Sequence, residues 1–391
     1  MRRTIFDEDH DAFRVTCRTF VDRVLRPDQE KHLANHEFGR QMWLEMGKLD
    51  LLGLNVPEAY GGSGLEDPRF ALVLAEELSK LAFAYSSCVG IHADCVAPYL
   101  VDLGTEEQKQ RWLPRFCTGE LVTAIAMTEP GGGSDLAALR TSAVRSGDDW
   151  LLNGSKTFIT NGYSADLVVV AARTSPDKGA RGITLFAVEA GMPGFERGRK
   201  LDKVGQAESD TAELFFSDVR LGPEQVIGEV DQGFIAMMER LAIERMGAAV
   251  NNLAHARQIL DETLVYVTER QAFGQPIGTF QANRFTLAEL VTQAEVTQAY
   301  VDACIMAQLE GTLTPVDAAK AKLWTAQVQN EILDACVQLW GGYGYMNEYR
   351  VTRAWADARV SRIWAGSSEI MKEIIGRDLG LAGQPVQRRA H

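Results

Sequence analysis

The hydrophobic pattern of this 391-residue chain changes its period twice, and this change limits the folds available to it. Residues 1–120 place apolar side chains three and four apart, which is typical of amphipathic helices. From about residue 121 the period falls to two, in short segments rich in β-branched and aromatic residues, and from about 231 it becomes helical again. We therefore predict an α+β multidomain protein, with a helical domain over 1–120, a β-domain over 121–230 and a helical domain over 231–391.

Local signals refine each part. Six β segments in roughly a hundred residues predict a barrel or sandwich, and Asn153-Gly154 inside the third is a strong signal for a two-residue hairpin turn. Thr105, followed by a Glu-rich turn, predicts the start of a helix. In the last region, breaks at "GTLTP" and "GGYGYMNEY" separate long helical segments that predict an antiparallel four-helix bundle. These segments cover 231–269, 281–310, 315–340 and 367–378.

Composition excludes several classes of protein. The net charge of −13 argues against a nucleic-acid binder, because such proteins need a basic face. The six scattered cysteines form no CxxC pair and have no metal-spaced histidines beside them, which favours reduced thiols and no metal site. No signal-peptide pattern opens the chain and no apolar run approaches the roughly 18 residues of a membrane span. We expect a cytoplasmic protein without a membrane span.

Four motifs could shape a ligand site, and each has an ordinary structural explanation too. "MTEPGGGSD" (127–135) could turn backbone N–H groups around an oxygen-rich ligand, or could be a plain glycine turn. In "FITNG" (158–162), Phe158 could stack on a planar ring or lie at a half-buried strand end. Arg270 in "ERQAFGQPIGTFQ" could bind a phosphate or cap its helix. The glycines of "QLWGGYGY" (338–345) could admit a ligand or stop a helix.

Taken in order with the closing "AGSSEIMKEIIGR", these motifs resemble those of the acyl-CoA dehydrogenase family over essentially the whole chain. The resemblance implies a flavoprotein, usually a homotetramer, that holds FAD between the β-domain and the C-terminal bundle. It implies α,β-dehydrogenation of an acyl-CoA, with electrons passed to an electron-transfer flavoprotein. Many relatives have tryptophan in place of Phe158, and often histidine in place of Trp340, to which we assign no role.

The resemblance also implies roles for individual residues. The acyl-CoA contacts would be Ser134, Arg245 and Gly366. The FAD contacts would be Ile125, Met127, Thr128, Gly133, Ser134, Phe158, Ile159, Thr160, Arg270, Phe273, Gln281, Gln338, Gly341, Gly342, Ser367 and Glu369. Of these, Arg270 and Gln281 often reach the cofactor of a neighbouring subunit in the family.

The catalytic base presents a difficulty, because many of these enzymes carry a glutamate where this chain has Ala365. Glu244 is the best replacement: on a helical projection it interrupts an apolar stripe, where a buried carboxyl would have a raised pKa. The alternative is a surface glutamate paired with Arg240. Resemblance favours the first, because isovaleryl-CoA and long-chain acyl-CoA dehydrogenases place their base at the position that matches Glu244. The Ala365 backbone N–H would still polarise the thioester.

Three questions stay open. The motifs lie nearest the long-chain type, which favours a medium or long straight acyl chain, with a short branched, isovaleryl-type substrate as the alternative. We expect "AYSSCVGIHADC" (84–95) to line the acyl pocket. A flavin monooxygenase or oxidase on the same fold is a second hypothesis, which the retained Glu244 disfavours. A non-catalytic scaffold is a third, and the intact flavin-contact motifs disfavour it.

Overall fold

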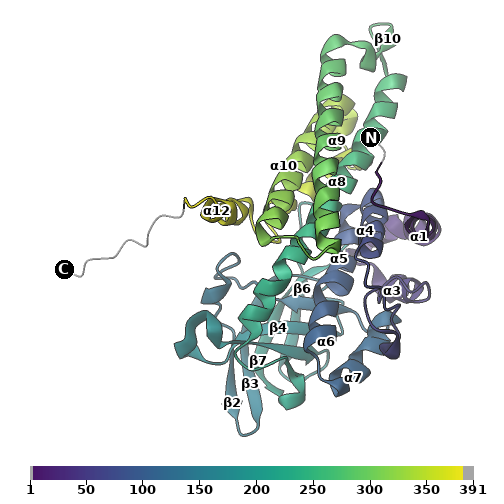
Figure 1. Cartoon of the computed structure of the whole chain (residues 1–391). Coiled ribbons are helices and arrows are strands. Elements are labelled where there is room, and N and C mark those ends of the chain that lie inside the picture. The colour runs from purple at the N-terminus through teal and green to yellow at the C-terminus, as the bar shows by residue number, and fades with distance from the viewer. Residues whose placement is uncertain (1–2, 382–391) are drawn as a thin grey trace.

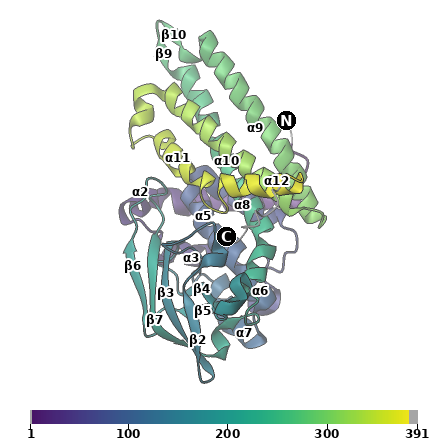
Figure 2. The ribbon, with the colours of Figure 1, turned by 90° about the vertical axis from the view of Figure 1, so that its left-hand side faces the viewer.

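The computed structural model describes residues 3–381. Figure 1 shows a sheet domain at one end, a group of long helices at the other, and the N-terminal helices packed along one side of both. Helix α12 (Ser368–Asp378) runs across the long helices where they meet the sheet domain (Figure 2). The helical, β and helical regions predicted from the hydrophobic period therefore form in that order.

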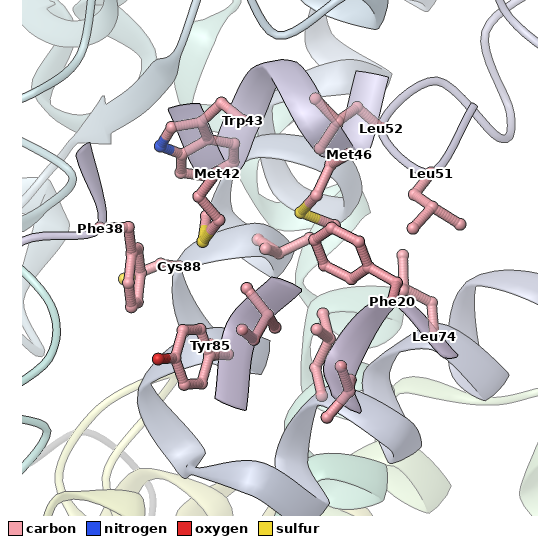
Figure 3. Close-up of a cluster of buried hydrophobic side chains, with 14 of the residues drawn as sticks. Phe20, Phe38, Met42, Trp43, Met46, Leu51, Leu52, Leu74, Tyr85 and Cys88 are labelled. Carbon is pink, nitrogen blue, oxygen red and sulfur yellow. The ribbon is translucent and has the colours of Figure 1, made fainter. Parts of the chain in front are cut away.

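The N-terminal helices surround a core of large apolar side chains. Phe20, Trp43, Met46 and Tyr85 are all at most 2% exposed and meet in this core (Figure 3). Thr105 caps its helix through a reciprocal bond with Gln108, so the predicted helix start is confirmed. The helices are α1 (Glu8–Phe20), α2 (Arg26–Asn35), α3 (Gly39–Gly47), α4 (Arg69–Leu81), α5 (Phe83–Gly90), α6 (Ala97–Leu103) and α7 (Glu106–Cys117), with π-helical turns η1 (Val21–Leu25) and η3 (Ile91–Val96).

The middle of the chain forms one folded sheet, in the strand order β6-β7-β3-β2-β4-β5-β8, with β1 beside β4. A single residue pair, Ser142 with Arg173, joins β2 to β4, and the two halves pack face to face through one apolar cluster. The other face of β4 and β5 packs on α6, α7 and the start of α8. The strands are β1 (Thr123–Ala126), β2 (Ser142–Ser146), β3 (Asp149–Thr160), β4 (Leu167–Arg173), β5 (Ile183–Glu189), β6 (Phe195–Lys200), β7 (Thr211–Leu221) and β8 (Val226–Ile227).

The hairpin predicted at Asn153-Gly154 is wrong. Both residues lie inside β3, at a shift in its pairing with β7, and the turn falls instead at Gly147-Asp148, between β2 and β3. Glycine is needed at 154 for another reason: its φ is +145°, and an added Cβ would lie 2.6 Å from the Thr141 hydroxyl oxygen. This glycine allows a bulge and a close approach between strands, not a turn.

The C-terminal region contains α8 (Gly233–Glu269), α9 (Gln281–Leu309) and α10 (Pro315–Trp340), followed by α11 (Arg350–Ala358) and α12. The four predicted helices are present, and α11 is an additional helix in 341–366, a stretch for which the sequence pattern predicts none. A short hairpin of β9 (Gln271–Ala272) and β10 (Gln275–Pro276) joins α8 to α9 at the far tip of the long helices (Figure 1).

Candidate active site

A strip of backbone where β1 and β3 end forms one wall of the candidate site. Thr157 donates its N–H to the Thr128 carbonyl at 3.0 Å, which brings "MTEPGGGSD" and "FITNG" side by side. Phe158 stands on a β-bulge with φ +59° and is 69% exposed. A left-handed backbone is unfavourable for phenylalanine, and such strain is concentrated at binding sites. The bulge turns this ring outward, so the half-buried strand end is excluded.

A buried ion pair between Lys156 and Glu129 holds this strip of backbone in place. The Lys156 ammonium donates to a Glu129 carboxylate oxygen at 2.9 Å and to the Met127 carbonyl at 3.0 Å. Glu129 also accepts the N–H groups of Arg140 and Thr141, at 2.6 and 2.9 Å. Its pKa is lowered, because these donors outweigh burial. The glutamate of the glycine motif is therefore part of the scaffold and does not face a ligand.

Glu244 lies on α8 with one carboxylate oxygen, Oε1, buried and without a hydrogen-bond partner among residues 3–381. Burial raises its pKa to about 7, against the opposing effects of Arg245, Arg240 and the Tyr99 hydroxyl. That hydroxyl lies beside the carboxylate but short of the geometry of a formed hydrogen bond. A carboxyl with this pKa can accept a proton at neutral pH.

The alternative pairing of Glu244 with Arg240 is wrong. The Arg240 guanidinium binds the Asp102 carboxylate at 2.9 Å and the Ala236 carbonyl at 3.1 Å, and it lies over the Tyr99 ring. Among the residues that the structure describes, Glu244 is therefore left without a hydrogen-bond partner for Oε1, on a partly buried face of α8.

The loop before α12 passes next to this turn of α8. A Cβ added at Gly366 would lie 3.8 Å from the Arg245 guanidinium nitrogen Nε, and the Lys322 ammonium donates to the Gly366 carbonyl. The Ala365 N–H donates no hydrogen bond within the described residues, and its φ is +50°. Among the described residues, the unbonded N–H of Ala365 thus lies in the loop that passes next to the helical turn of the unpartnered Glu244 carboxylate.

Some of the predicted FAD contacts lie outside this site within one chain. Arg270, Phe273 and Gln281 lie at the tip of the long helices with the 338–342 segment, far from the sheet domain (Figure 1). Arg270 lies over the Tyr343 ring, and Phe273 is 95% exposed. Ile159 is turned into the sheet core, so only its backbone can contact a ligand. Trp340 stacks on Tyr266 at 4.0 Å, which gives it a packing role.

Asp94, Tyr99, Lys156 and Lys322 were not selected from the sequence. Asp94 lines a cavity of about 20 Å³ together with Gly90 and Ala93, all within the predicted 84–95 segment, and the side chains of α4. Its carboxylate has no hydrogen bond or ion pair within residues 3–381, and burial raises its pKa to about 7.

This carboxyl should destabilise the fold at high pH. Because the folded-state pKa lies above the ordinary value of 3.8, stability is lost as the pH rises from about 4 to about 7. We expect Asp94→Asn to raise stability at pH 8 by about 1–3 kcal/mol, with a smaller gain as the pH approaches 4. Thermal unfolding at both pH values measures this. Asp148→Asn, on the exposed β2–β3 turn, is the control, and an unchanged Tm for Asp94→Asn at pH 8 would contradict the account.

Comparison with known proteins identifies the family. The acyl-CoA dehydrogenase N-terminal domain matches residues 7–120, the middle domain 124–219 and the C-terminal domain 231–380. This chain belongs to the acyl-CoA dehydrogenase family. Members of the family are FAD-dependent oxidoreductases that act on the CH–CH group of acyl-CoA thioesters.

Individual relatives are similar over nearly their full length. The long-chain specific acyl-CoA dehydrogenase of Rattus norvegicus mitochondria is 43% identical over 383 residues, which is 96% of this chain and 88% of that protein. The mitochondrial isovaleryl-CoA dehydrogenase of Pongo abelii is 36% identical over 374 residues, or 95% and 88%. A solved acyl-CoA dehydrogenase from Geobacillus kaustophilus has a TM-score of 0.94 at 42% identity, with 96% of this chain and 98% of that chain covered.

The residues present fit FAD. The exposed Phe158 ring offers a face for a planar ring system, next to the backbone of the β1–β3 strip. At the tip, a Cβ added at Gly341 or Gly342 would meet open space, so the backbone there is accessible. At α12, Ser367 caps a helix N-terminus, which is a favourable place for an anionic group. Within the described residues, no group of three or more His, Cys, Asp or Glu side chains could hold a metal ion, and no helix could span a membrane.

Proposed function

We propose that this protein dehydrogenates a medium- or long-chain acyl-CoA to the trans-2-enoyl-CoA, with Glu244 as the base. The observation that carries the proposal is the unpartnered Glu244 carboxylate, whose pKa is raised to about 7, beside a loop with a free N–H donor. Bound FAD supplies the acceptor for the hydride that leaves Cβ. Residues of this chain remove the α-proton and polarise the thioester.

Two groups of this chain act on the substrate. Glu244 removes the α-proton, and its raised pKa keeps it basic enough to hold that proton. Ala365 presents its N–H to the thioester oxygen as negative charge grows there, which stabilises the enolate-like transition state. Since this donor is in the backbone, alanine serves as well as glutamate at position 365. Ser134, Arg245 and Gly366 are the proposed acyl-CoA contacts.

The acyl chain is proposed to extend past η3 towards α4. Burial, followed by the charges of Glu244 and Asp94, raises the pKa of the Cys95 thiol of η3. The nearness of Cys95 to both carboxylates supports a path along the 84–95 segment, from the proposed base to the cavity at Gly90. Gly90 and Ala93 leave room that larger side chains would fill. The higher identity to a long-chain specific acyl-CoA dehydrogenase, 43% against 36% for an isovaleryl-CoA dehydrogenase, supports medium or long straight chains over short branched ones.

The distribution of the proposed FAD contacts supports an assembly of several subunits. Arg270, Phe273 and Gln281 are too far along the bundle to share a cofactor with Phe158 of the same chain (Figure 1). We infer that they contact a neighbouring subunit's FAD in a homotetramer. We further propose cytoplasmic location, electron-transfer flavoprotein as acceptor, and domain bounds at 1–120, 121–230 and 231–391.

A substrate panel tests the function. Purified holoenzyme is given straight-chain acyl-CoA from C4 to C18 and isovaleryl-CoA, with an artificial electron acceptor, while oxygen consumption is followed in parallel. We expect enoyl-CoA formation with highest kcat/KM in the medium to long range and little oxygen use. Preference for isovaleryl-CoA would contradict the chain-length assignment. Turnover that requires oxygen, or no turnover with any thioester, would contradict the dehydrogenase itself.

A further inference from the structure

Lys322 is a fully buried lysine whose ammonium group has one hydrogen-bond partner in the part of the chain that the structure describes. It lies on α10 at 0% exposure, and its Nζ donates to the Gly366 carbonyl of the loop before α12. Within residues 3–381 it forms no ion pair with a carboxylate. Burying an ammonium group without a counter-charge is unfavourable, so its retention here requires a compensating role.

The charges around Lys322 affect how favourable its protonated form is. Burial, followed by repulsion from Arg245 of α8, lowers its pKa to about 8, and Glu369 of α12 opposes this. Arg245 is itself buried, and its Nε has no hydrogen-bond partner within the described residues. Two cations on neighbouring helices therefore face the same loop, and the one bond that relieves Lys322 is the bond to that loop.

The loop before α12 has a strained backbone that needs outside contacts to fix it. Ala365 and Gly366 both have left-handed backbones, with φ of +50° and +85°, and for alanine this conformation is strained. Any side chain at position 366 would be strained by this φ, although the Met371 terminal carbon, 2.5 Å from an added Cβ, is the end of a flexible side chain and could move aside. The free Ala365 N–H belongs to this strained pair of residues, so its direction depends on what fixes the Gly366 carbonyl.

We propose that Lys322 is a positioning residue: by binding the Gly366 carbonyl, it fixes the loop that aims the Ala365 N–H at the substrate thioester. The inference rests on the proposed function, because it assigns Lys322 to the polarisation of that thioester. Lys322 does not touch the reacting atoms. Its hydrogen bond to the Gly366 carbonyl orients the Ala365 N–H, which lies two peptide units earlier in the chain.

Lys322→Met tests the proposal, with Lys320→Met as the matched control. Lys320 lies two residues away on the same helix, is exposed, and within residues 3–381 forms its one ion pair with Asp317, at 3.5 Å. We expect Lys322→Met to lower kcat about tenfold or more with KM changed far less, because a misplaced donor weakens transition-state binding. Lys322→Arg, which keeps the charge and donors, should restore part of the loss. Equal kcat for Lys322→Met and Lys320→Met in folded, FAD-loaded enzyme would overturn the proposal.

Two further readouts separate positioning from simple stability. Hydrogen–deuterium exchange in peptides covering 362–370 should speed up in Lys322→Met and stay unchanged in Lys320→Met; unchanged exchange in both would overturn the proposal. The parent enzyme should also lose kcat above about pH 8, as Lys322 loses its proton and donates more weakly. Lys322→Met should lack this alkaline loss, and its persistence would overturn the assignment. Exchange needs no substrate, so it tests the loop even if the parent turns over no acyl-CoA, which would refute the proposed function alone.

Discussion

Glu244→Gln is expected to slow the anaerobic reduction of bound flavin by a saturated acyl-CoA by about 10²–10⁴-fold, which is the usual range for loss of a general base. Glutamine keeps the shape of the side chain but cannot accept the α-proton, so substrate should still bind while bleaching of the flavin absorbance almost stops. Stopped-flow absorbance with excess acyl-CoA and no oxygen measures this rate directly.

Glu239→Gln is the matched control, because Glu239 lies on the same helix and is exposed. In the parent enzyme, kcat/KM should rise with pH through about 7, because Glu244 must be unprotonated to act as the base. Glu244→Gln should lack this rise. If flavin bleaching in Glu244→Gln is as fast as in the parent, Glu244 is not the base and the proton must leave by another route.

Lys156→Met is expected to destabilise the protein by about 3–5 kcal/mol, because removing one partner of a buried ion pair leaves an uncompensated buried charge. Here that charge is the Glu129 carboxylate, which also holds the N–H groups of Arg140 and Thr141. The Met127 carbonyl loses its donor as well, so we expect FAD content after purification to fall. Chemical denaturation and the absorbance ratio of flavin to protein measure the two effects.

Lys178→Met provides the comparison for this second prediction. Lys178 pairs with Asp231 at 2.7 Å, but its side chain is 60% exposed. Asp231 is 12% exposed and keeps its hydrogen bonds from Thr174 and Ser175 in this variant. Loss of the solvent-exposed ammonium should therefore cost only about 0–1 kcal/mol, so the variant should unfold close to the parent and keep its flavin. Similar losses of stability in the two variants would show that burial of the Lys156 pair has no special importance. A stable Lys156→Met protein with full FAD content would contradict the role of the pair altogether.

Much of the fold could be predicted because its signals are local. The change of period between residues 121 and 231 reports burial on one face of a strand or helix, and capping at Thr105 depends on residues three apart. Glu244 could be selected because its apolar stripe shows the buried face directly. These features depend on neighbours within a few turns of the chain.

Other features depend on distant neighbours. β6 is polar and β8 has two residues, so their pairing with β7 and β5 leaves little trace in the local pattern. Gly154 lies at a bulge and not in a turn, and it must be glycine because of Thr141, which directly precedes the neighbouring strand β2. Lys322 did offer a signal: in "AAKAKLWTA" the two lysines are two residues apart and must leave α10 on different faces. Only the loop that Lys322 meets, 44 residues later, shows which one points inward.

Helix α8 carries Glu244 close to where the long helices meet the sheet domain and leads into Arg270 at their far tip, in 37 residues without a proline or a break. Each residue of an α-helix advances the chain by about 1.5 Å and turns it by about 100°. Deleting one residue between Glu244 and Arg270 would therefore rotate the whole tip, with its hairpin, relative to Glu244. The length of this helix is consequently as strictly constrained as any side chain in the site, and insertions or deletions in the family should avoid it.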